Sequence, residues 1–456
     1  MAKRQSRRKR ERLPQQAVVV SVTDLTHDGR GVASVEGKRV FIEGALPGEE
    51  VSFTYVEQHS NYDVGVVAKV LRPSPERVIP PCAAYGECGG CALQHLDALA
   101  QLRAKERQMV ENLRRIGKVN VSEIAAPLRG STLGYRRKSR LGVKKVAAKG
   151  RVLVGFRERR SSYLTNMWRC EVLHPAAGAQ LAGWSERLAQ LDAGDRIPQL
   201  EVAVDEVGLT MVLRNLDPLT LDDLQRLQQW QEEEGITLWL QPAGPDSITT
   251  LDSYAKEIPA NPAALKLLSY TLPEFALRYY FLPTDFTQVN FEINQLMVAQ
   301  ALAWLNPTAN ETVLDLFCGI GNFTLALARR AKYLVGVEGS AAAVERARYN
   351  ATANGLSNVE FHLADLNSPT MTTAAWWQHP FTSVLLDPSR EGAEAVMPLL
   401  AKKGVKRIVY VSCNPATLAR DIGILVNQHG YRLERVGVMD MFPHTAHVES
   451  MALLVH

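Results

Sequence analysis

The last third of this 456-residue chain carries the pattern that most limits its fold. From Pro283 onward, short apolar segments alternate with stretches of helical composition. The apolar segments are TVLDLF, YLVGVE, VEFHLAD, SVLLDP and RIVYVSC, which begin at residues 312, 333, 359, 383 and 407. Nearly continuous apolar strands separated by helices are typical of a parallel, doubly wound α/β sheet. Ligands bind such sheets at the carboxyl ends of the strands.

A glycine turn follows the first of these strands. In VLDLFCGIGNFTLALARR a strand over Val313–Phe317 precedes Gly319 and Gly321, and an amphipathic helix is expected after them. Glycine lets the backbone turn tightly and approach a ligand closely. The third glycine of a dinucleotide fingerprint is missing, so a pyrophosphate is not expected here. Asp315, just ahead of the turn, suits a positively charged cofactor without phosphate.

Two acids at the ends of the next strands extend this pocket. Glu338 ends LVGVE and is placed to accept both hydroxyls of a ribose. Asp365, in LADL, can meet the amino group of an adenine. Together with Asp315 and the glycine turn, these acids predict a pocket for S-adenosylmethionine. The alternative is a set of ordinary strand-to-helix turns with capping acids.

Reactive side chains follow the fourth and fifth strands and recur near the carboxyl terminus. Asp387 ends SVLLDP, Cys413 ends VYVSC, and MDMFPHTAHVES contains Glu449. Carbon 5 of uracil is a poor nucleophile, but addition of a thiolate at carbon 6 turns it into an enolate carbon that accepts a methyl group. A base must then remove the proton from carbon 5 before the thiol is expelled. Cys413 and Glu449 can supply these two groups.

Each of these assignments has a structural alternative. Cys413 can be a buried thiol at a strand end, and Glu449 can be a surface carboxylate. Cys318, in FCGIG, is a competing thiol, but its position before the glycine turn favours packing beneath the cofactor. Spacing alone leaves the choice for Cys413 open.

The first part of the chain is rich in β-strand patterns and in basic residues. Residues 16–76 hold short strand-like segments broken by Asp-Gly, Gly-Lys and Pro-Gly turns, as in a small antiparallel barrel of the oligonucleotide-binding type. The net charge is only +4, but lysine and arginine gather in the tail up to Arg12 and again over Tyr135–Arg160. Such localised charge indicates binding of a phosphate backbone. A solvated charged surface is the alternative for either cluster alone.

Six cysteines are present in a chain for which we expect a cytoplasmic location. No apolar run approaches the roughly 18 residues of a membrane helix, and no apolar segment follows the basic amino terminus. In a reducing compartment, cysteines favour metal binding or catalysis over disulfides. Cys82, Cys88 and Cys91 follow a Cys-x5-Cys-x2-Cys spacing, with Cys170 as a distant fourth thiolate. Four thiolates suit zinc or a cubane iron–sulfur cluster equally well.

Composition divides the chain into four parts. We expect a basic disordered tail over residues 1–15 and the barrel over 16–76. The proline-rich segment RPSPERVIPPC marks the next boundary. A central mixed domain over 77–282 is expected to hold the cysteine loop and a helix over about 93–117, and the catalytic domain spans 283–456.

These motifs together resemble those of the RNA uracil-C5 methyltransferase family. The matching segments are QVN at Gln288–Asn290, LDLFCGIGNF, LLDPSREG, YVSCNPATLARD and DMFPHTAHVES, and the barrel resembles the TRAM domain of that family. The resemblance implies a Rossmann-like, S-adenosylmethionine-dependent methyltransferase domain with Cys413 as the nucleophile and Glu449 as the base. It also implies that the cofactor and the target base are lined by Gln288, Phe317, Asn322, Glu338, Asp365 and Asp387.

The cysteine loop resembles the iron–sulfur region of family members that methylate 23S ribosomal RNA. This implies that Cys82, Cys88, Cys91 and Cys170 hold a 4Fe–4S cluster and that the substrate is a uridine of 23S ribosomal RNA. We expect a monomer that binds neither DNA nor a membrane. One alternative is methylation of a transfer RNA or of another ribosomal uridine. From a different class, the alternative is a non-catalytic RNA-binding factor for ribosome assembly.

Overall fold

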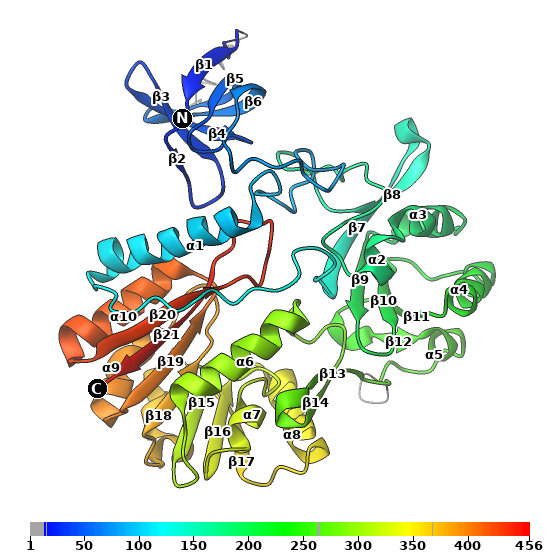
Figure 1. Cartoon of the computed structure of the whole chain (residues 1–456). Coiled ribbons are helices and arrows are strands. Elements are labelled where there is room, and N and C mark those ends of the chain that lie inside the picture. The colour runs from blue at the N-terminus through cyan, green and yellow to red at the C-terminus, as the bar shows by residue number, and fades with distance from the viewer. Residues whose placement is uncertain (1–12, 15, 262–264, 367) are drawn as a thin grey trace, which may run out of the picture. The chain divides into compact units, whose positions relative to one another are not determined.

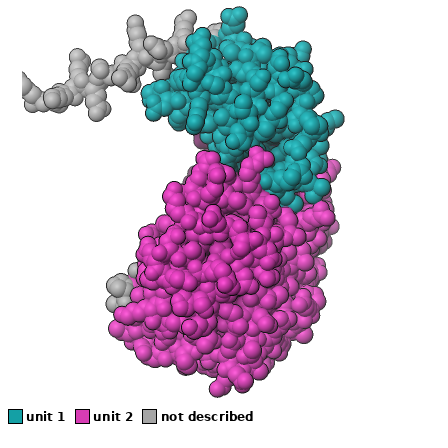
Figure 2. All heavy atoms as spheres, turned by 60° about the vertical axis from the view of Figure 1, so that its left-hand side comes forward, with its two compact units in different colours: residues 1–81, 91–104, 444–446 teal, residues 82–90, 105–443, 447–456 magenta. Residues whose placement is uncertain are grey.

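The computed structural model describes the chain except for residues 1–12, 15, 262–264 and 367. The chain divides into two compact units, which are coloured separately in Figure 2. The first unit consists of residues 1–81, 91–104 and 444–446, and the second of residues 82–90, 105–443 and 447–456. Most of the expected basic tail, including its cluster up to residue 12, lies outside the described residues.

The first unit is built around a sheet with the strand order β1-β5-β6-β4-β3-β2 (Figure 1). Its strands are β1 (Val18–Ser21), β2 (Asp24–Leu25), β3 (Gly31–Val35), β4 (Lys38–Glu43), β5 (Glu50–Gln58) and β6 (Tyr62–Arg72). Burial alternates along the strands as one-sided packing requires, so that Val40 and Ile42 of β4 are fully buried. They pack with Val51 and Phe53 of β5. A small β-rich unit therefore occupies the region where the barrel was predicted.

The helix expected over about 93–117 begins later than predicted. α1 spans Ala98–Asn112 and continues into one π-helical turn, Leu113–Gly117. Its start is set by Asp97, whose Oδ1 accepts hydrogen bonds from the amides of Leu99 (3.0 Å) and Ala100 (3.1 Å), as an N-cap does. The preceding residues form turns and a β-bridge instead of helix.

A second sheet, with the order β12-β11-β10-β9-β7-β8, lies in the central part of the second unit (Figure 1). Its strands are β7 (Lys138–Val146), β8 (Arg151–Gly155), β9 (Gln199–Val204), β10 (Leu209–Arg214), β11 (Thr237–Leu240) and β12 (Thr249–Thr250). The associated helices are α2 (Pro175–Gly178), α3 (Leu181–Ala189), α4 (Leu221–Glu234) and α5 (Leu251–Ala255). The β7–β8 hairpin forms part of the basic stretch, and β7 exposes Arg140, Lys144 and Lys145 while burying Leu141 and Val143.

The third sheet has the order β17-β16-β15-β18-β19-β21-β20 and is reached through the hairpin β13 (Leu268–Leu272) and β14 (Leu277–Phe281). Its strands are β15 (Thr312–Leu316), β16 (Tyr333–Glu338), β17 (Val359–Leu363), β18 (Ser383–Leu386), β19 (Arg407–Ser412), β20 (Arg432–Met439) and β21 (Glu449–Val455). The first five are parallel, which confirms the predicted α/β architecture. β21 runs antiparallel between β19 and β20, a departure from the expected parallel sheet.

Helices cover both faces of this sheet (Figure 1). They are α6 (Phe291–Leu305), α7 (Thr324–Ala328), α8 (Ala341–Ala353), α9 (Met397–Lys403) and α10 (Pro415–His429). Val409 and Val411 of β19 share a core with α6, α7 and α8, whereas Tyr410 between them donates a hydrogen bond to Asp421 of α10. The prediction of an amphipathic helix after the glycine turn is wrong. A helix, α7, is present there, but it is short and all of its residues are buried, so it has no polar face.

The strand order places a topological switch point between β15 and β18. The chain runs outward from β15 to β17 and then returns to place β18 on the other side of β15. Open α/β sheets bind ligands in the crevice beyond such a point. None of the described helices is both long and apolar enough to cross a membrane.

Candidate active site

Two predicted residues meet at the switch point. β15 and β18 pair up to Leu316 and Leu386, so the next residues, Phe317 and Asp387, follow side by side. The amide of Asp387 donates to the carbonyl of Leu316 (3.3 Å), which extends the pairing by one step. Phe317 has a positive φ of 62°, so the chain leaves the strand abruptly at this position. Both residues are partly exposed at the carboxyl edge of the sheet.

Cys413 and Glu449 meet in the same way one strand further along. β19 and β21 pair antiparallel up to Ser412 and Ser450, so Cys413 and Glu449 are the next facing positions. Both side chains are partly buried. Burial raises the pKa of Cys413 to about 11, and the negative charges of Glu449 and Asp387 add to this effect. The sequence alone could not show whether Cys413 and Glu449 lie close together. The register of β19 and β21 places them at neighbouring positions.

The acids of this cluster hold protons more tightly than ordinary carboxylates. Burial raises the pKa of Glu449 to about 8, and Asp387 adds to the shift while Arg390 and Lys105 oppose it. Burial also raises the pKa of Asp387 to about 7. Near neutral pH the free site therefore holds a thiol and largely protonated Glu449. Elevated carboxyl pKa values are suited to acid–base chemistry near neutral pH.

A cationic group borders the cluster. Arg390, in the loop after β18, opposes the rise in the pKa of Cys413 and holds Nη2 3.0 Å from Nδ1 of His447. Its carbonyl accepts hydrogen bonds from Asn414 Nδ2 (3.0 Å) and Thr417 Oγ1 (3.3 Å), which fix this loop against the start of α10. Although His447 as a whole is exposed, desolvation of its ring, with the charge of Arg390 as the next cause, lowers its pKa, which favours the neutral imidazole.

The two residues after Cys413 begin a helix. Asn414 is the N-cap of α10, and its Oδ1 accepts from the amide of Ala416 (3.0 Å). Pro415 occupies the first helical position, where its missing N–H costs nothing. β19 therefore ends and α10 begins around Cys413, which places the sulfur at the carboxyl edge of the sheet.

The predicted cofactor acid Glu338 caps the turns around it. Its Oε2 accepts from the amide of Gly319 (3.0 Å) and its Oε1 from the amide of Ser340 (2.9 Å). Glu338 therefore acts as a capping acid, as the alternative interpretation predicted. Each of its carboxylate oxygens still has a lone pair that can accept a hydrogen bond from a ligand. Its role in binding ribose stays a prediction.

Asn322 is held by a network on the protein side of the glycine turn. Its Oδ1 accepts from Tyr270 Oη (2.8 Å) and Asn294 Nδ2 (3.1 Å), and its Nδ2 donates to Asn294 Oδ1 (2.8 Å). Its carbonyl accepts from Tyr279 Oη (3.0 Å). Asn322 therefore ties the turn to α6 and to the β13–β14 hairpin, and direct contact with a cofactor stays a prediction.

Asp315 does not face an open pocket, contrary to our expectation. Its side chain is fully buried, and its Oδ2 accepts a hydrogen bond from Thr324 Oγ1 (2.5 Å). Its Oδ1 has no hydrogen-bond partner among the described residues. Burial raises the pKa of Asp315 to about 8, so this group is mostly neutral near pH 7 and is no carboxylate partner for a cation.

Gln288 and Asp365 lie in loops of the described chain, and their roles at the site stay predictions. Gln288 is partly buried in the loop between β14 and α6, and Asn290 two residues later donates to the carbonyl of Met441 (3.4 Å). Asp365 is exposed beyond the end of β17. Cys318 is buried in the core, where a Cβ on Gly336 would lie 3.1 Å from its sulfur, so its interpretation as a packing thiol is confirmed.

The predicted metal ligands lie in loops that pair with one another in part. Cys88 forms a β-bridge with Glu158, and its sulfur accepts from the amide of Gly90 (3.4 Å). Burial raises the pKa of Cys170 to about 11, and charge on Cys82 and Cys88 adds to the shift. Cys91 belongs to the first unit, whereas Cys82, Cys88 and Cys170 belong to the second. Within the described residues, no cluster of three or more potential ligands has the arrangement of a metal site.

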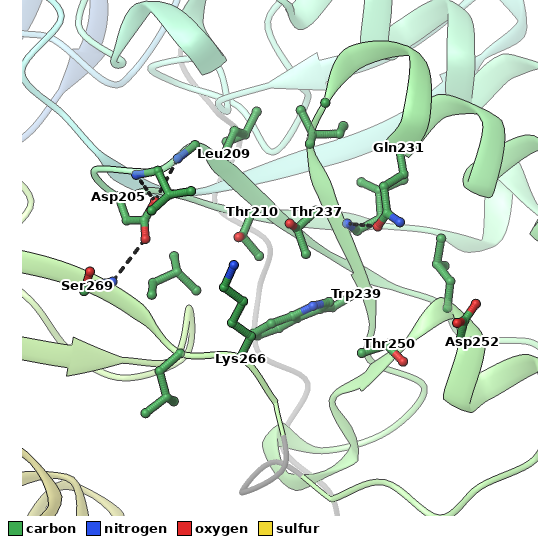
Figure 3. Close-up of a pocket in the computed structure, with 18 of the residues that line it drawn as sticks. Asp205, Leu209, Thr210, Gln231, Thr237, Trp239, Thr250, Asp252, Lys266 and Ser269 are labelled. Atoms are coloured by element: carbon green, nitrogen blue, oxygen red, sulfur yellow. Dashed lines mark hydrogen bonds between the residues drawn. The ribbon is translucent and has the colours of Figure 1, made fainter.

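A separate pocket lies in the central part of the second unit and is lined by none of the predicted site residues (Figure 3). Asp205 Oδ2 accepts from the amide of Ser269 (3.1 Å) at one side of it. Gln231 Oε1 accepts from the amide of Leu238 (2.9 Å) at the other. These two side chains thus already serve the fold.

Sequence reasoning missed Lys105 and Tyr270. Lys105 lies in a helix of ordinary amphipathic pattern, and Tyr270 lies in a strand with no motif, so neither carried a signal. Both join the site only through partners distant in the chain, Asp440 and Asn322.

Known proteins are similar to this chain over nearly its whole length. Residues 270–456 match the family model described as tRNA (Uracil-5-)-methyltransferase, and residues 12–53 match the TRAM domain. The 23S rRNA (uracil(1939)-C(5))-methyltransferase RlmD of Hahella chejuensis is 48% identical over 98% of this chain and 99% of its own. The protein of the same name from Methylococcus capsulatus is 47% identical over 98% of this chain and 99% of its own.

A solved structure shares the fold. It is the Pyrococcus abyssi tRNA (uracil-54, C5)-methyltransferase in complex with S-adenosyl-L-homocysteine, with a TM-score of 0.71 and 24% identity, covering 96% of this chain and 99% of that chain. From the full-length relatives, the methyltransferase and TRAM matches and this shared fold, the chain belongs to the RNA uracil-C5 methyltransferase family.

Proposed function

We propose that this chain methylates carbon 5 of the uridine equivalent to U1939 of 23S ribosomal RNA, as its relatives are named for doing. The observation that carries the chemistry is the facing position of Cys413 and Glu449 at the end of the β19–β21 pair. A nucleophile and a base set side by side are what methylation of this carbon requires. A binding factor needs neither group.

The reaction follows from these residues. Cys413, once deprotonated, forms a bond from its sulfur to carbon 6 of the uracil, and carbon 5 becomes nucleophilic. S-adenosylmethionine, when bound, would supply the electrophilic methyl group to carbon 5, and its sulfur would leave as the thioether of S-adenosylhomocysteine. Glu449 then takes the proton from carbon 5, the double bond to carbon 6 re-forms, and the sulfur leaves as a thiolate. Arg390 favours the thiolate, because its charge opposes the rise in the pKa of Cys413.

RNA contacts are expected from the basic β7–β8 hairpin and from the TRAM domain, which matches residues 12–53. Arg140, Lys144 and Lys145 are exposed along β7 and are suited to phosphate contacts. The target base must leave its stack to reach the partly buried Cys413, as in other enzymes that modify a base. Substrate choice therefore rests on how the RNA is held and on how readily the base is extruded.

The test is methylation of unmodified 23S ribosomal RNA with labelled S-adenosylmethionine, followed by mapping of 5-methyluridine. One labelled uridine at the position equivalent to U1939 is expected. The Cys413→Ala variant serves as the inactive control, with RNA binding measured in parallel. Label in transfer RNA or at another ribosomal uridine would contradict the substrate assignment, and RNA binding without any label would favour the assembly factor.

We also propose that Cys82, Cys88, Cys91 and Cys170 hold a 4Fe–4S cluster. The donor chemistry fits, because clusters are held by four thiolates and tuned by hydrogen bonds to sulfur. The amide of Gly90 donates to Cys88, and the amides of Val172 and Leu173 donate to Cys170. Cys91 follows Gly90 directly in the chain. The cluster would supply a structural link between the cysteine loop and the Cys170 loop.

Anaerobic purification with iron, sulfide and zinc analysis tests this proposal. About four irons per chain and a broad visible absorption are expected. Cys88→Ser should lower the iron content, whereas Cys318→Ala, which changes a core thiol, should leave it unchanged. A colourless protein that contains zinc would overturn the assignment.

A further inference from the structure

A buried ion pair lies beside the predicted base. Lys105 of α1 places Nζ 2.7 Å from Oδ1 of Asp440, and both side chains are only 3% exposed. The same Nζ donates to the carbonyl of Phe442 (3.0 Å). Lys105 therefore makes two charge-assisted hydrogen bonds to one short segment, Asp440–Phe442, within the second unit.

That segment is continuous with the strand that pairs with Glu449. In the β20–β21 pair, Met439 faces Glu449, and Asp440 is the next residue along the chain. The amide of Asp440 also donates to the carbonyl of Leu128 (2.8 Å), and the carbonyl of Met441 accepts from Asn290. The ammonium group of Lys105 is thus anchored one residue beyond the cross-strand partner of Glu449.

Stability alone is a weak reason for such a pair. Taking two charges out of water costs roughly as much as their attraction returns, and an apolar pair of similar volume often does as well. A buried pair placed against a catalytic group can instead position that group and set its protonation. The charge on Lys105 is among those that oppose the rise in the pKa of Glu449.

We propose that Lys105 is a positioning residue for the proton-abstraction step, holding Asp440–Phe442 so that Glu449 reaches carbon 5 as a carboxylate. In that step the carbon 5–hydrogen bond breaks, the proton goes to a carboxylate oxygen of Glu449, and the electron pair forms the double bond to carbon 6. The bond from carbon 6 to the sulfur of Cys413 breaks and the thiolate leaves. This inference rests on the proposed function and adds a residue to it.

Several charged groups surround Glu449 and act on the same proton. Asp387 from the end of β18 raises the pKa of Glu449, while Arg390 from the following loop lowers it, as Lys105 does. Glu449 in turn raises the pKa of Cys413 on β19. His447 lies two residues before Glu449, in the loop that leads into β21, and its Nδ1 is 3.0 Å from Nη2 of Arg390. Among these groups, Lys105 alone lies on a helix, α1, and none of its hydrogen bonds in the described structure goes to Cys413 or Glu449, so it can be changed separately.

The experiment follows one turnover on an unmodified 23S ribosomal RNA fragment with methyl-labelled S-adenosylmethionine from about pH 6 to about pH 9. The labelled protein–RNA adduct is counted on denaturing gels as it forms and as it decays. In Lys105→Met, adduct decay at neutral pH should slow about tenfold, and its pH midpoint should rise by about one unit, because the carboxylate has lost a favourable charge. Adduct formation should change by less than about threefold, and Lys105→Arg should restore most of the decay rate.

Two further variants make the result decisive. Lys105→Met/Asp440→Asn leaves no unpaired buried charge, and it should show the same rise in the pH midpoint even if the single variant does not fold. Arg407→Met breaks the ion pair of Arg407 with Glu311 (2.6 Å) at the opposite end of β19 and should leave the midpoint unchanged. An unchanged midpoint in the folded double variant, or formation and decay slowed by one common factor, would overturn the role of Lys105. A wild-type protein that forms neither adduct nor methylated RNA would instead refute the proposed function.

Discussion

Cys413 and Glu449 occupy the first facing positions beyond the last paired residues of β19 and β21, Ser412 and Ser450. Burial raises the pKa of the Cys413 thiol, and the negative charges of Glu449 and Asp387 both add to this rise, so the three groups lie near one another. The thiol and the carboxyl group therefore share one edge of the sheet, next to Asp387 at the end of β18. This relationship governs the pH behaviour of the reaction.

The rate of methylation should rise with pH through about 8. Glu449 must be a carboxylate to accept the proton from carbon 5, and burial raises its pKa to about 8, so below that pH most of it is already protonated. The Cys413 thiol, whose pKa burial raises to about 11, is also favoured as a thiolate at higher pH. Initial rates of label transfer at saturating RNA and fixed ionic strength check this. A rate that is flat between about pH 6 and about pH 8 would contradict it.

Replacing Asp315 by Asn should stabilise the protein increasingly as the pH rises. The pKa of Asp315 in the folded chain is raised by burial to about 8, above the unfolded value near 4, so its contribution to stability is complete below about pH 4 and is lost as the pH rises through 8. The neutral amide avoids this loss, which is at most about 5 kcal/mol near pH 8 for a shift of roughly four pKa units at about 1.4 kcal/mol each. Urea unfolding at pH values near 5 and 8 measures the difference.

The control is Asp217→Asn, which removes an exposed carboxylate paired with Arg196 (2.5 Å). The free energy of unfolding should hardly change in this control, because surface pairs contribute little. Equal stability of Asp315→Asn and the wild type at both pH values would mean that Asp315 is not the buried neutral acid described above.

Tyr270→Phe should weaken binding of S-adenosylmethionine more than it slows the chemical steps. The hydroxyl donates to Asn322 Oδ1 (2.8 Å), and its loss frees the turn beside the predicted cofactor pocket. One neutral hydrogen bond contributes roughly 0.5–1.5 kcal/mol, so KM for the methyl donor should rise about 2- to 10-fold with kcat nearly constant. Tyr431→Phe, which removes a similar buried hydrogen bond to Val405 (2.6 Å) at the far end of the sheet, should leave KM unchanged. An equal effect of both variants would point to a general loss of stability.

The five parallel strands of the catalytic sheet could be predicted because each is a short, largely apolar run, and four of the five end at a polar residue. The central runs are buried on both faces, and their pattern depends only on local sequence. The positions of Phe317, Asp387 and Cys413 at strand ends followed from the same pattern. α7 misled the prediction because its residues are buried on every side, so no polar face exists to read.

Long-range pairing could not be read from the chain. Glu449 faces Cys413 only because β21 inserts antiparallel between β19 and β20, and register between distant strands leaves no local trace. The burial of Asp315 depends likewise on Thr324 and on the core around it. Lys105 lies 335 residues from its partner Asp440, and one lysine in an amphipathic helix looks like any other.

The most direct test of the account is whether Glu449→Gln traps a methylated covalent complex between Cys413 and RNA. The amide cannot take the proton from carbon 5, so the reaction should stop after methyl transfer. Labelled protein–RNA adduct that survives denaturant should accumulate to about one per enzyme, and it should be absent from Cys413→Ala/Glu449→Gln. Adduct in the double variant would exclude Cys413 as the nucleophile. Normal release of methylated RNA by Glu449→Gln would show that Glu449 is not the base.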